Sequence, residues 1–179
     1  MPGNSFICFD KSIPKGESLH ESHPGNSGWI EISDWSWDIE ADTSFLKGGG
    51  ASVGKPTPGT LSFSHYYDLA SPVIMQRIVQ GTHFDSAHIV MLKQTGGDKG
   101  EGYFGVDLTE VFITKVSSKG AEDGSVTQDV ECVFKTISVG YKRQMEDGKL
   151  DSTQRDFVWD IGKMKSDAPK ADLAVKGAS

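Results

Sequence analysis

The sequence predicts a mainly β protein: an antiparallel two-sheet β-barrel with one short flanking α-helix at about residues 71–80. Apolar and polar residues alternate with a period of two along most of the chain, which is typical of half-buried strands. In several stretches the apolar residues change parity partway along, which means that they move from even-numbered to odd-numbered positions or the reverse. Turns rich in Gly, Ser and Asp separate the stretches. Long strands that bend and change sheets are what closed barrels and orthogonal sandwiches require.

The changes of parity mark the expected bends. In WIEISDWSWDIE the apolar residues are Ile30 and Ile32, followed by Trp35 and Trp37. A one-residue phase change turns side chains to the opposite face, so residues 33–34 are expected to form a bulge or corner. YFGVDLTEVFITKV and VTQDVECVFKTISVGY change parity in the same way. Further strands are expected at SFICF, TLSFSHY, AHIVMLK and DFVWDI.

One segment, SPVIMQRIVQG, has the signals of a helix. Ser71 is a plausible N-cap, Pro72 suits the first helical position, and Gly81 suits a left-handed C-cap. Ile74 and Ile78 lie one turn apart. A helix this short needs to pack its apolar stripe against the sheet.

The length of 179 residues fits one domain, which we place at residues 1–161. From Gly162 onwards the periodicity disappears. Residues 162–179 are therefore expected to form a mobile C-terminal tail.

The charge and the hydropathy pattern argue against two classes of partner. A net charge of -7 and a pI near 5.2 do not favour nucleic acid, which prefers a basic surface. The start of the sequence shows no signal-like segment, and no run of roughly 18 apolar residues occurs, so neither classical export nor membrane insertion is expected. We therefore expect the protein to be made and to fold in the cytosol.

The two cysteines, Cys8 and Cys132, stand in apolar alternating stretches. Free cysteine is among the most buried residue types, so structural thiols are the favoured interpretation. A disulfide is the minority alternative.

The stretch GGGASVGKPT comes close to a phosphate-binding loop, since Gly49 is followed after four residues by Gly54 and Lys55. Pro56, however, stands where the magnesium-binding hydroxyl belongs. The prolines that follow also prevent the helix whose N-terminus would hold the phosphate. The stretch is therefore expected to be a long Gly-rich loop of another function.

No catalytic, cofactor or metal site is predicted. The histidines of HESH, His20 and His23, form the one close pair, and a metal would need further ligands from the fold. A solvated loop is the preferred interpretation. His65 and His83 are expected at strand ends or a half-buried edge rather than as bases.

Trp35 and Trp37 share one face of a strand. They could form a platform for a sugar. Packing in the core or at a subunit interface is the commoner fate of two large aromatic residues.

The order of these elements resembles the haemolysin-coregulated protein (Hcp) family, the tube subunit of the bacterial type VI secretion system. The resemblance runs from about Phe6 to Ile161 and rests on the order and spacing of several motifs. These are KGES, WIEISDWSWDIE with its W-x-W ending, GGGASVGK, LSFSHYYD, SPVIMQRIVQGTHFDSAHI with its G-x-H-F turn, and SSKGAEDGSVTQDVECVFKTISVGY. The polar loop at residues 20–28 and the tail after Ile161 depart from the family pattern.

The resemblance implies a homo-hexameric ring whose copies stack into a tube. Such a tube is propelled from the cell by a sheath, together with a spike, and the lumen holds small effector proteins. A protein without a signal peptide would thus begin in the cytoplasm and become extracellular. The Gly-rich loop would reach a neighbouring subunit through Phe45, Leu46, Gly48, Gly49, Gly50 and Lys55. Two alternatives stay open at this point: a secreted effector enzyme on the same scaffold, and a carbohydrate-binding module using Trp35 and Trp37.

Overall fold

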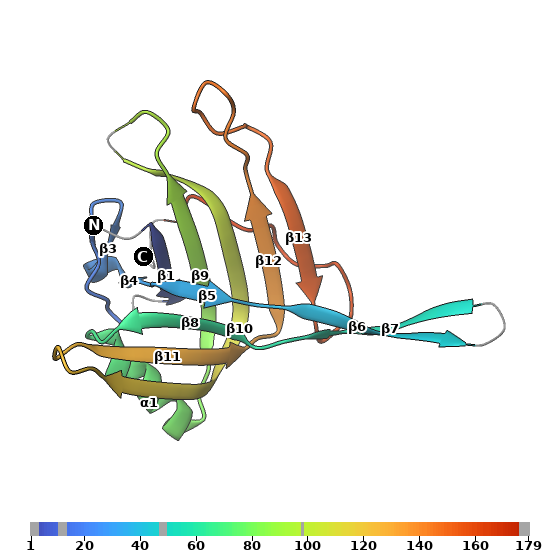
Figure 1. Ribbon diagram of the computed structural model, residues 1–179, viewed down its shortest axis with the longest axis horizontal. Coiled ribbons are helices and arrows are strands. Elements are labelled where there is room, and N and C mark those ends of the chain that lie inside the picture. The colour runs from blue at the N-terminus through green and yellow to red at the C-terminus, as the bar shows by residue number, and fades with distance from the viewer. Residues whose placement is uncertain (1–3, 11–13, 47–49, 98, 176–179) are drawn as a thin grey trace.

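The computed structural model describes residues 4–10, 14–46, 50–97 and 99–175 and consists mainly of strands (Figure 1). The one α-helix is α1 (Ala70–Gln80), and a short 3-10 helix, η2 (Gly25–Ser27), precedes β4. The strands are β1 (Ser5–Phe9), β2 (Leu19–His20), β3 (His23–Pro24), β4 (Trp29–Glu31), β5 (Asp34–Ser36), β6 (Ile39–Leu46), β7 (Gly50–Pro58), β8 (Leu61–Tyr66), β9 (Phe84–Lys93), β10 (Glu101–Gly120), β11 (Val126–Val133), β12 (Thr136–Tyr141) and β13 (Arg155–Asp160).

Nine strands form one branched antiparallel sheet in the order β4-β1-β9-β10-β11-β8-β5, with β12 and β13 branching from β10. The first half of β10 pairs with β9 and β12, and its second half pairs with β11. Strand β10 therefore belongs to two layers that meet at its bend (Figure 1). The mainly antiparallel β fold with one helix is confirmed. Closure into a barrel is not confirmed, because no ladder between the described strands joins β5 to β13.

The bends lie where the apolar parity changes. Strand β4 pairs with β1 whereas β5 pairs with β8, so the chain changes layer between Glu31 and Asp34. In β10 the turn is made at Glu110, whose φ of 49° is left-handed. Phe134 and Lys135 separate β11 from β12. The predicted corners are confirmed at all three places.

Strand β1 is buried on both faces. Ile7 and Phe9 lie in the main core between the layers, together with Phe63, Phe84 and other apolar side chains. The opposite face carries Phe6 and Cys8, which form a second cluster with Trp29, Val90 and Leu92. The short β2–β3 hairpin lies over this cluster, because the His20 and His23 rings both lie 5.1 Å from the Phe6 ring.

Helix α1 ends as predicted, with Gly81 left-handed at φ 65°. Its start differs from the prediction, because the helix begins at Ala70 and Ser71 lies inside its first turn. Asp68 accepts a hydrogen bond from the Ala70 N–H at 2.9 Å, and the Ser71 hydroxyl accepts one from the Asp68 N–H at 3.0 Å. Ser71 as N-cap is therefore wrong. The carboxylate of Asp68 satisfies the free N–H at this helix end.

The segment after β13 crosses the outer face of β10 and β12 as far as Val175. Ala171 and Leu173 are buried, and the Asp172 N–H donates to Asp107 Oδ2 at 3.0 Å. This segment, the C-terminal strap, lies on the sheet as a single extended stretch with few side chains turned towards it. Its sequence therefore shows no alternation of apolar and polar residues. Mobility of residues 162–179 stays a prediction, but the described part lies against the sheet.

Candidate assembly interface

Strands β6 and β7 form a separate two-stranded sheet that projects from the body of the molecule (Figure 1). The ladder runs from Ile39 opposite Pro58 to Leu46 opposite Gly50. Within the described residues, the two strands contact each other and make only marginal contact with other elements. The long Gly-rich loop expected at GGGASVGKPT is wrong for the described residues, because Gly50–Pro58 form strand β7. The pairing satisfies the backbone hydrogen-bonding groups despite the glycines and prolines.

The register gives this hairpin two unlike faces. Residues directly opposite each other in an antiparallel ladder share a face, and the faces alternate along each strand. At the base of the hairpin, one face therefore receives Ile39/Pro58 and Ala41/Pro56, and the other receives Glu40/Thr57. The base of the hairpin is thus amphipathic.

The residues predicted to contact a neighbour fall on different parts of this hairpin. Phe45 and Leu46 end β6, where they pair with Ala51 and Gly50 of β7. Lys55 is exposed, beside the register shift between Ala41 and Thr43. Gly48 and Gly49 lie outside the described residues. The contact role of all six stays a prediction.

The geometry around Lys55 also bears on the phosphate-loop question. Lys55 and Pro56 lie within strand β7, and the chain continues into β8 rather than into a helix. A phosphate loop needs a helix N-terminus at this position to bind the anion. The stretch GGGASVGKPT is therefore not a phosphate-binding loop.

An apolar cavity of about 300 Å³ opens at the base of the same hairpin. Ile39 and Phe157 lie at its mouth, 41% and 42% exposed, and Val106 and Ile137 lie buried at its floor. The remaining lining residues are Trp35, Trp37 and Val139. The cavity lies between the two strands, β5 and β13, that no ladder joins.

Both tryptophans of the cavity are held in fixed orientations. Trp35 stacks on Phe104 at 5.4 Å between ring centroids, and its N–H lies 3.4 Å from Met91 Sδ. Trp37 donates to the Gly59 carbonyl at 3.1 Å and packs near Phe134. Because both are partly buried and packed on other rings, they do not form the open platform that a carbohydrate-binding module would need.

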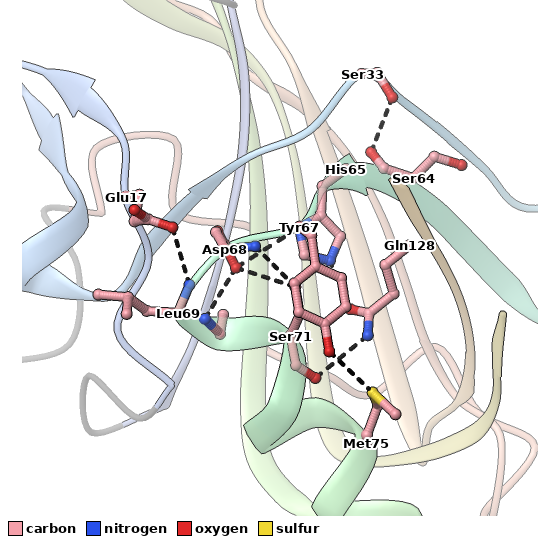
Figure 2. A network of polar contacts seen from close by, with 11 residues as sticks. Glu17, Ser33, Ser64, His65, Tyr67, Asp68, Leu69, Ser71, Met75 and Gln128 are labelled. Carbon is pink, nitrogen blue, oxygen red and sulfur yellow. Dashed lines mark hydrogen bonds and ion pairs between the residues drawn. The ribbon is translucent and has the colours of Figure 1, made fainter. Parts of the chain in front are cut away.

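A buried polar network joins the start of α1 to the sheet (Figure 2). His65 Nε2 lies 2.7 Å from Gln128 Oε1, and Gln128 donates to the Ser71 carbonyl at 3.3 Å. Burial raises the pKa of the Asp68 carboxyl, although the nearby His65 opposes this shift. Glu17 Oε2 accepts from the Leu69 N–H at 3.0 Å. The network positions the helix, and His65 is a buried structural residue rather than one at a half-buried edge.

The HESH histidines are not a solvated loop. His23 is buried, stacks on Phe6 and meets the edge of Trp29 at 4.6 Å. Burial lowers the pKa of His23 to about 4, and the neighbouring His20 adds to this shift. In the described parts of the chain, no group of three or more metal-ligating side chains comes together.

The cysteines are free, buried thiols, as predicted. Burial raises the pKa of Cys132 to about 12 and raises the pKa of Cys8 even further. Neither thiol therefore has nucleophilic character.

The outer side of α1 is an apolar surface that the sequence analysis missed. Leu69 and Val79 are 65% and 80% exposed, and Met75 and Tyr66 lie exposed nearby in the chain. The signal was present: five apolar residues within SPVIMQRIVQ are too many for one buried stripe. None of the helices in the described ranges is long and apolar enough to cross a membrane.

Comparison with known proteins identifies the family to which a chain with this architecture belongs. The family model described as "Type VI secretion system effector, Hcp" matches residues 6–141. Protein hcp1 of Pseudomonas aeruginosa is 32% identical over 149 residues, which cover 82% of this chain and 89% of that protein.

Two solved structures share the fold. A type six secretion system protein superposes with a TM-score of 0.79 at 22% identity, covering 90% of this chain and 97% of its own. Hcp1 from Salmonella typhimurium gives a TM-score of 0.70 at 26% identity, with 90% and 98% covered. The matched region spans both layers, the helix and the projecting hairpin. The chain therefore belongs to the Hcp family, the structural tube proteins of type VI secretion.

Proposed function

We propose that six copies of this chain form a ring and that such rings stack into the secretion tube, with the β6–β7 hairpin joining neighbouring subunits. The observation that carries the proposal is the hairpin itself. It projects from the body (Figure 1) and has only marginal contact with the rest of its own chain within the described residues. An isolated two-stranded hairpin is marginal in water, so a neighbouring subunit is needed to cover it.

A closed ring also requires two different, matching surfaces on each subunit, because its contacts are head-to-tail. The chain has more than one unlike apolar surface. One is the apolar cavity at the base of the hairpin, and the other is the outer side of α1 with Leu69 and Val79 exposed. The hairpin and α1 lie on different parts of the body (Figure 1). Exposed apolar surface of this kind in a soluble domain indicates protein contacts.

The tube is expected to leave the cytoplasm with a spike, propelled by a sheath, and to carry small effector proteins in its lumen. This chain would then become extracellular without inserting into a membrane. Family membership supports this sequence of events, and a structural protein needs no catalytic site for it.

Electrostatics is expected to act mainly between rings. Six copies at -7 give 6 × (-7) = -42 for each ring. Exposed charges are screened over about 8 Å in physiological salt, whereas desolvated contacts are screened much less. Raising the salt concentration should therefore change stacking, measured by light scattering, before it changes the mass of the ring. Rings that dissociate before stacking changes would contradict this assignment of charge.

The hairpin supplies the direct test. We would replace residues 44–56 by a short Gly-Ser linker, which removes its outer part and keeps the body intact. Circular dichroism should stay nearly unchanged, because loop closure depends only weakly on length. Tube formation in electron micrographs and secretion should both fall.

A matched control shortens the exposed turn at residues 121–124 between β10 and β11, which should leave tubes unaffected. Normal tubes from the hairpin variant would show that β6–β7 is only a connector. Unfolding of that variant would show that the hairpin packs within its own subunit.

A further inference from the structure

We infer that the β2–β3 hairpin, residues 18–25, is a lid that opens in acid. When it is closed, the hairpin lies beside β1 and β4 and covers the apolar cluster around Phe6 and Trp29 (Figure 1). His20 and His23 are the groups whose protonation opens it. The lid and its cluster belong to one chain, so opening does not depend on the proposed ring.

The hairpin is small, and aromatic contacts hold it to the body. Each of its strands has two residues, and Leu19 is 95% exposed. The rings of both histidines lie 5.1 Å from the Phe6 ring. At the tip, Glu21 forms an exposed ion pair with Lys99 at 2.7 Å, and exposed pairs contribute little stability. A hairpin this short is not stable alone, so loss of the ring contacts releases it.

The closed hairpin leaves two buried polar atoms without partners. His23 is 7% exposed, and Trp29 is fully buried. Neither His23 Nδ1 nor Trp29 Nε1 has a hydrogen-bond partner among the described residues. A buried polar group without a partner costs free energy that contact with water recovers. Opening therefore gives both atoms hydrogen bonds to water, which offset part of the lost apolar contact.

Protonation weakens the contacts of the closed hairpin. His20 Nδ1 accepts a hydrogen bond from the Ser22 N–H at 3.2 Å, and a proton on this nitrogen turns it into a donor and breaks the bond. A proton on His23 places a charge against the apolar rings of Phe6 and Trp29. The two histidine rings lie 5.5 Å apart, so two charged rings also repel each other.

The direction of the pH response follows from the environment of His23. Burial and the neighbouring His20 lower the pKa of His23 to about 4. In the open hairpin, water surrounds the ring and the pKa returns towards its ordinary value of 6.5. The open state therefore binds the proton more tightly. The closed state is favoured above pH 6.5, and this preference is lost as the pH falls towards 4.

The other titratable groups around the lid do not compensate a charge on His23. They are Glu17 and Glu21 in and beside the hairpin, Glu31 on β4, Cys8 on β1, and His88 with its partner Asp107 on β9 and β10. Glu17 accepts a hydrogen bond from the Leu69 N–H, and Glu21 pairs with Lys99. Among the described residues, only His20 adds its charge to the effect of burial on the pKa of His23.

Hydrogen exchange of the full chain, followed by mass spectrometry, tests the lid. The exchange rate of the hairpin amides, divided by the rate of the unfolded protein at the same pH, measures the open fraction. A fragment covering residues 14–28 contains the lid, and one covering residues 126–141 in β11 and β12 is the internal reference. With pKa values of about 4 in the closed state and 6.5 in the open state, the normalised rate of the lid fragment should rise about 20-fold between pH 7 and pH 5.

The reference fragment should show no such rise. A lid fragment whose normalised rate stays constant would overturn the inference. An equal rise in both fragments would overturn it as well, because the whole chain would then be unfolding. Neither result bears on the proposed ring, whose test is tube formation.

His23→Phe keeps the ring contacts and removes the proton acceptor, so most of the acid response of residues 14–28 should disappear. His83→Phe, at an exposed site, is the matched control and should keep the response. His20→Asn leaves an oxygen that can accept from the Ser22 N–H but cannot become charged, so it should reduce the response less than His23→Phe does. The full 20-fold rise in a folded His23→Phe protein would exclude His23 as the switch. If this variant does not fold, the two fragments of the parent protein decide.

The native thiols provide a second measurement on the parent protein. Cys8 belongs to the cluster under the lid, and Cys132 belongs to the main core. Labelling by 4,4′-dithiodipyridine, divided by the rate in denaturant at the same pH, should rise for Cys8 between pH 7 and pH 5 and stay constant for Cys132. A constant rate for Cys8 would mean that the cluster stays covered, against the inference.

Gly25→Ala should open the lid without acid. A Cβ at Gly25 would collide with the backbone of Gly16 and force the base of the hairpin apart. Labelling of Cys8 should therefore increase already at pH 7. Gly97→Ala, where a Cβ meets no atom of the described residues closer than 3.9 Å, is the control and should label like the parent. Equal labelling of Cys8 in the two variants would show that the hairpin is not its cover.

Discussion

His65 and Gln128 face each other across the β8–β11 ladder, with the histidine Nε2 2.7 Å from the glutamine Oε1. Both side chains are buried, and Gln128 also donates to the Ser71 carbonyl in the first turn of α1. One cross-strand pair therefore fixes the position of the helix on the sheet (Figure 2).

Replacing Gln128 by leucine should lower the free energy of unfolding by about 2 kcal/mol. The change leaves the buried His65 N–H and the Ser71 carbonyl without their partner, and an unsatisfied buried group costs about 1–3 kcal/mol. Urea denaturation at pH 7 measures the loss. Gln76→Leu, on the exposed side of α1, is the control and should change stability little. Equal stabilities of the two variants would contradict the role given to the network.

Stability should fall as the pH decreases from about 6.5 towards 4, in part because of His23. Its folded pKa is lowered from 6.5 to about 4, so between these values the unfolded state binds a proton that the folded state does not. The contribution is complete above pH 6.5 and is lost as the pH falls through this window.

His23→Phe keeps the aromatic contact with Phe6 and removes the titration. The difference in unfolding free energy between the parent and this variant should therefore change between pH 7 and pH 4.5, to the disadvantage of the parent. His83→Phe, an exposed site, serves as the control. A difference that stays constant with pH would show that His23 is not protonated on unfolding.

The C-terminal strap should be released by a single methyl group. Gly102 lies so close to the Leu173 carbonyl that a Cβ would collide with backbone, which has little freedom to move aside. Gly102→Ala should therefore expose residues 162–175 to limited proteolysis and cost about 1–3 kcal/mol of stability. Gly97→Ala is the matched control, because a Cβ there meets no atom of the described residues closer than 3.9 Å. Identical digestion patterns would show that the strap does not depend on this contact.

Neither native thiol should react with a thiol reagent in the folded protein. Burial raises the pKa of Cys132 to about 12 and that of Cys8 further, so the reactive thiolate is scarce at pH 8. Ellman's reagent should label both cysteines in denaturant and neither without it, whereas a cysteine at an exposed position, Lys119→Cys, should react at once in the folded protein. Rapid labelling of the parent protein would mean that β1 or β11 opens readily.

The sequence by itself determined the features that depend on neighbouring residues. A change of apolar parity marks each bend because a strand can move its apolar side chains to the other face only by turning, as at Glu110. Gly81 ends α1 because a left-handed residue is needed there. The prolines after Lys55 exclude a phosphate loop because they prevent a helix from starting there, which is also a property of neighbouring residues.

Only the tertiary structure decided the contacts between distant segments. Asp68 rather than Ser71 satisfies the start of α1 because Glu17, His65 and Gln128, far apart in the sequence, fix where the helix begins. The β6–β7 ladder pairs Phe45 with Ala51 and Leu46 with Gly50, where the sequence predicted a loop. The cavity and the strap depend on how strands pair across long stretches of chain. Such pairing is a property of the whole fold, since no local pattern specifies which distant backbone groups meet.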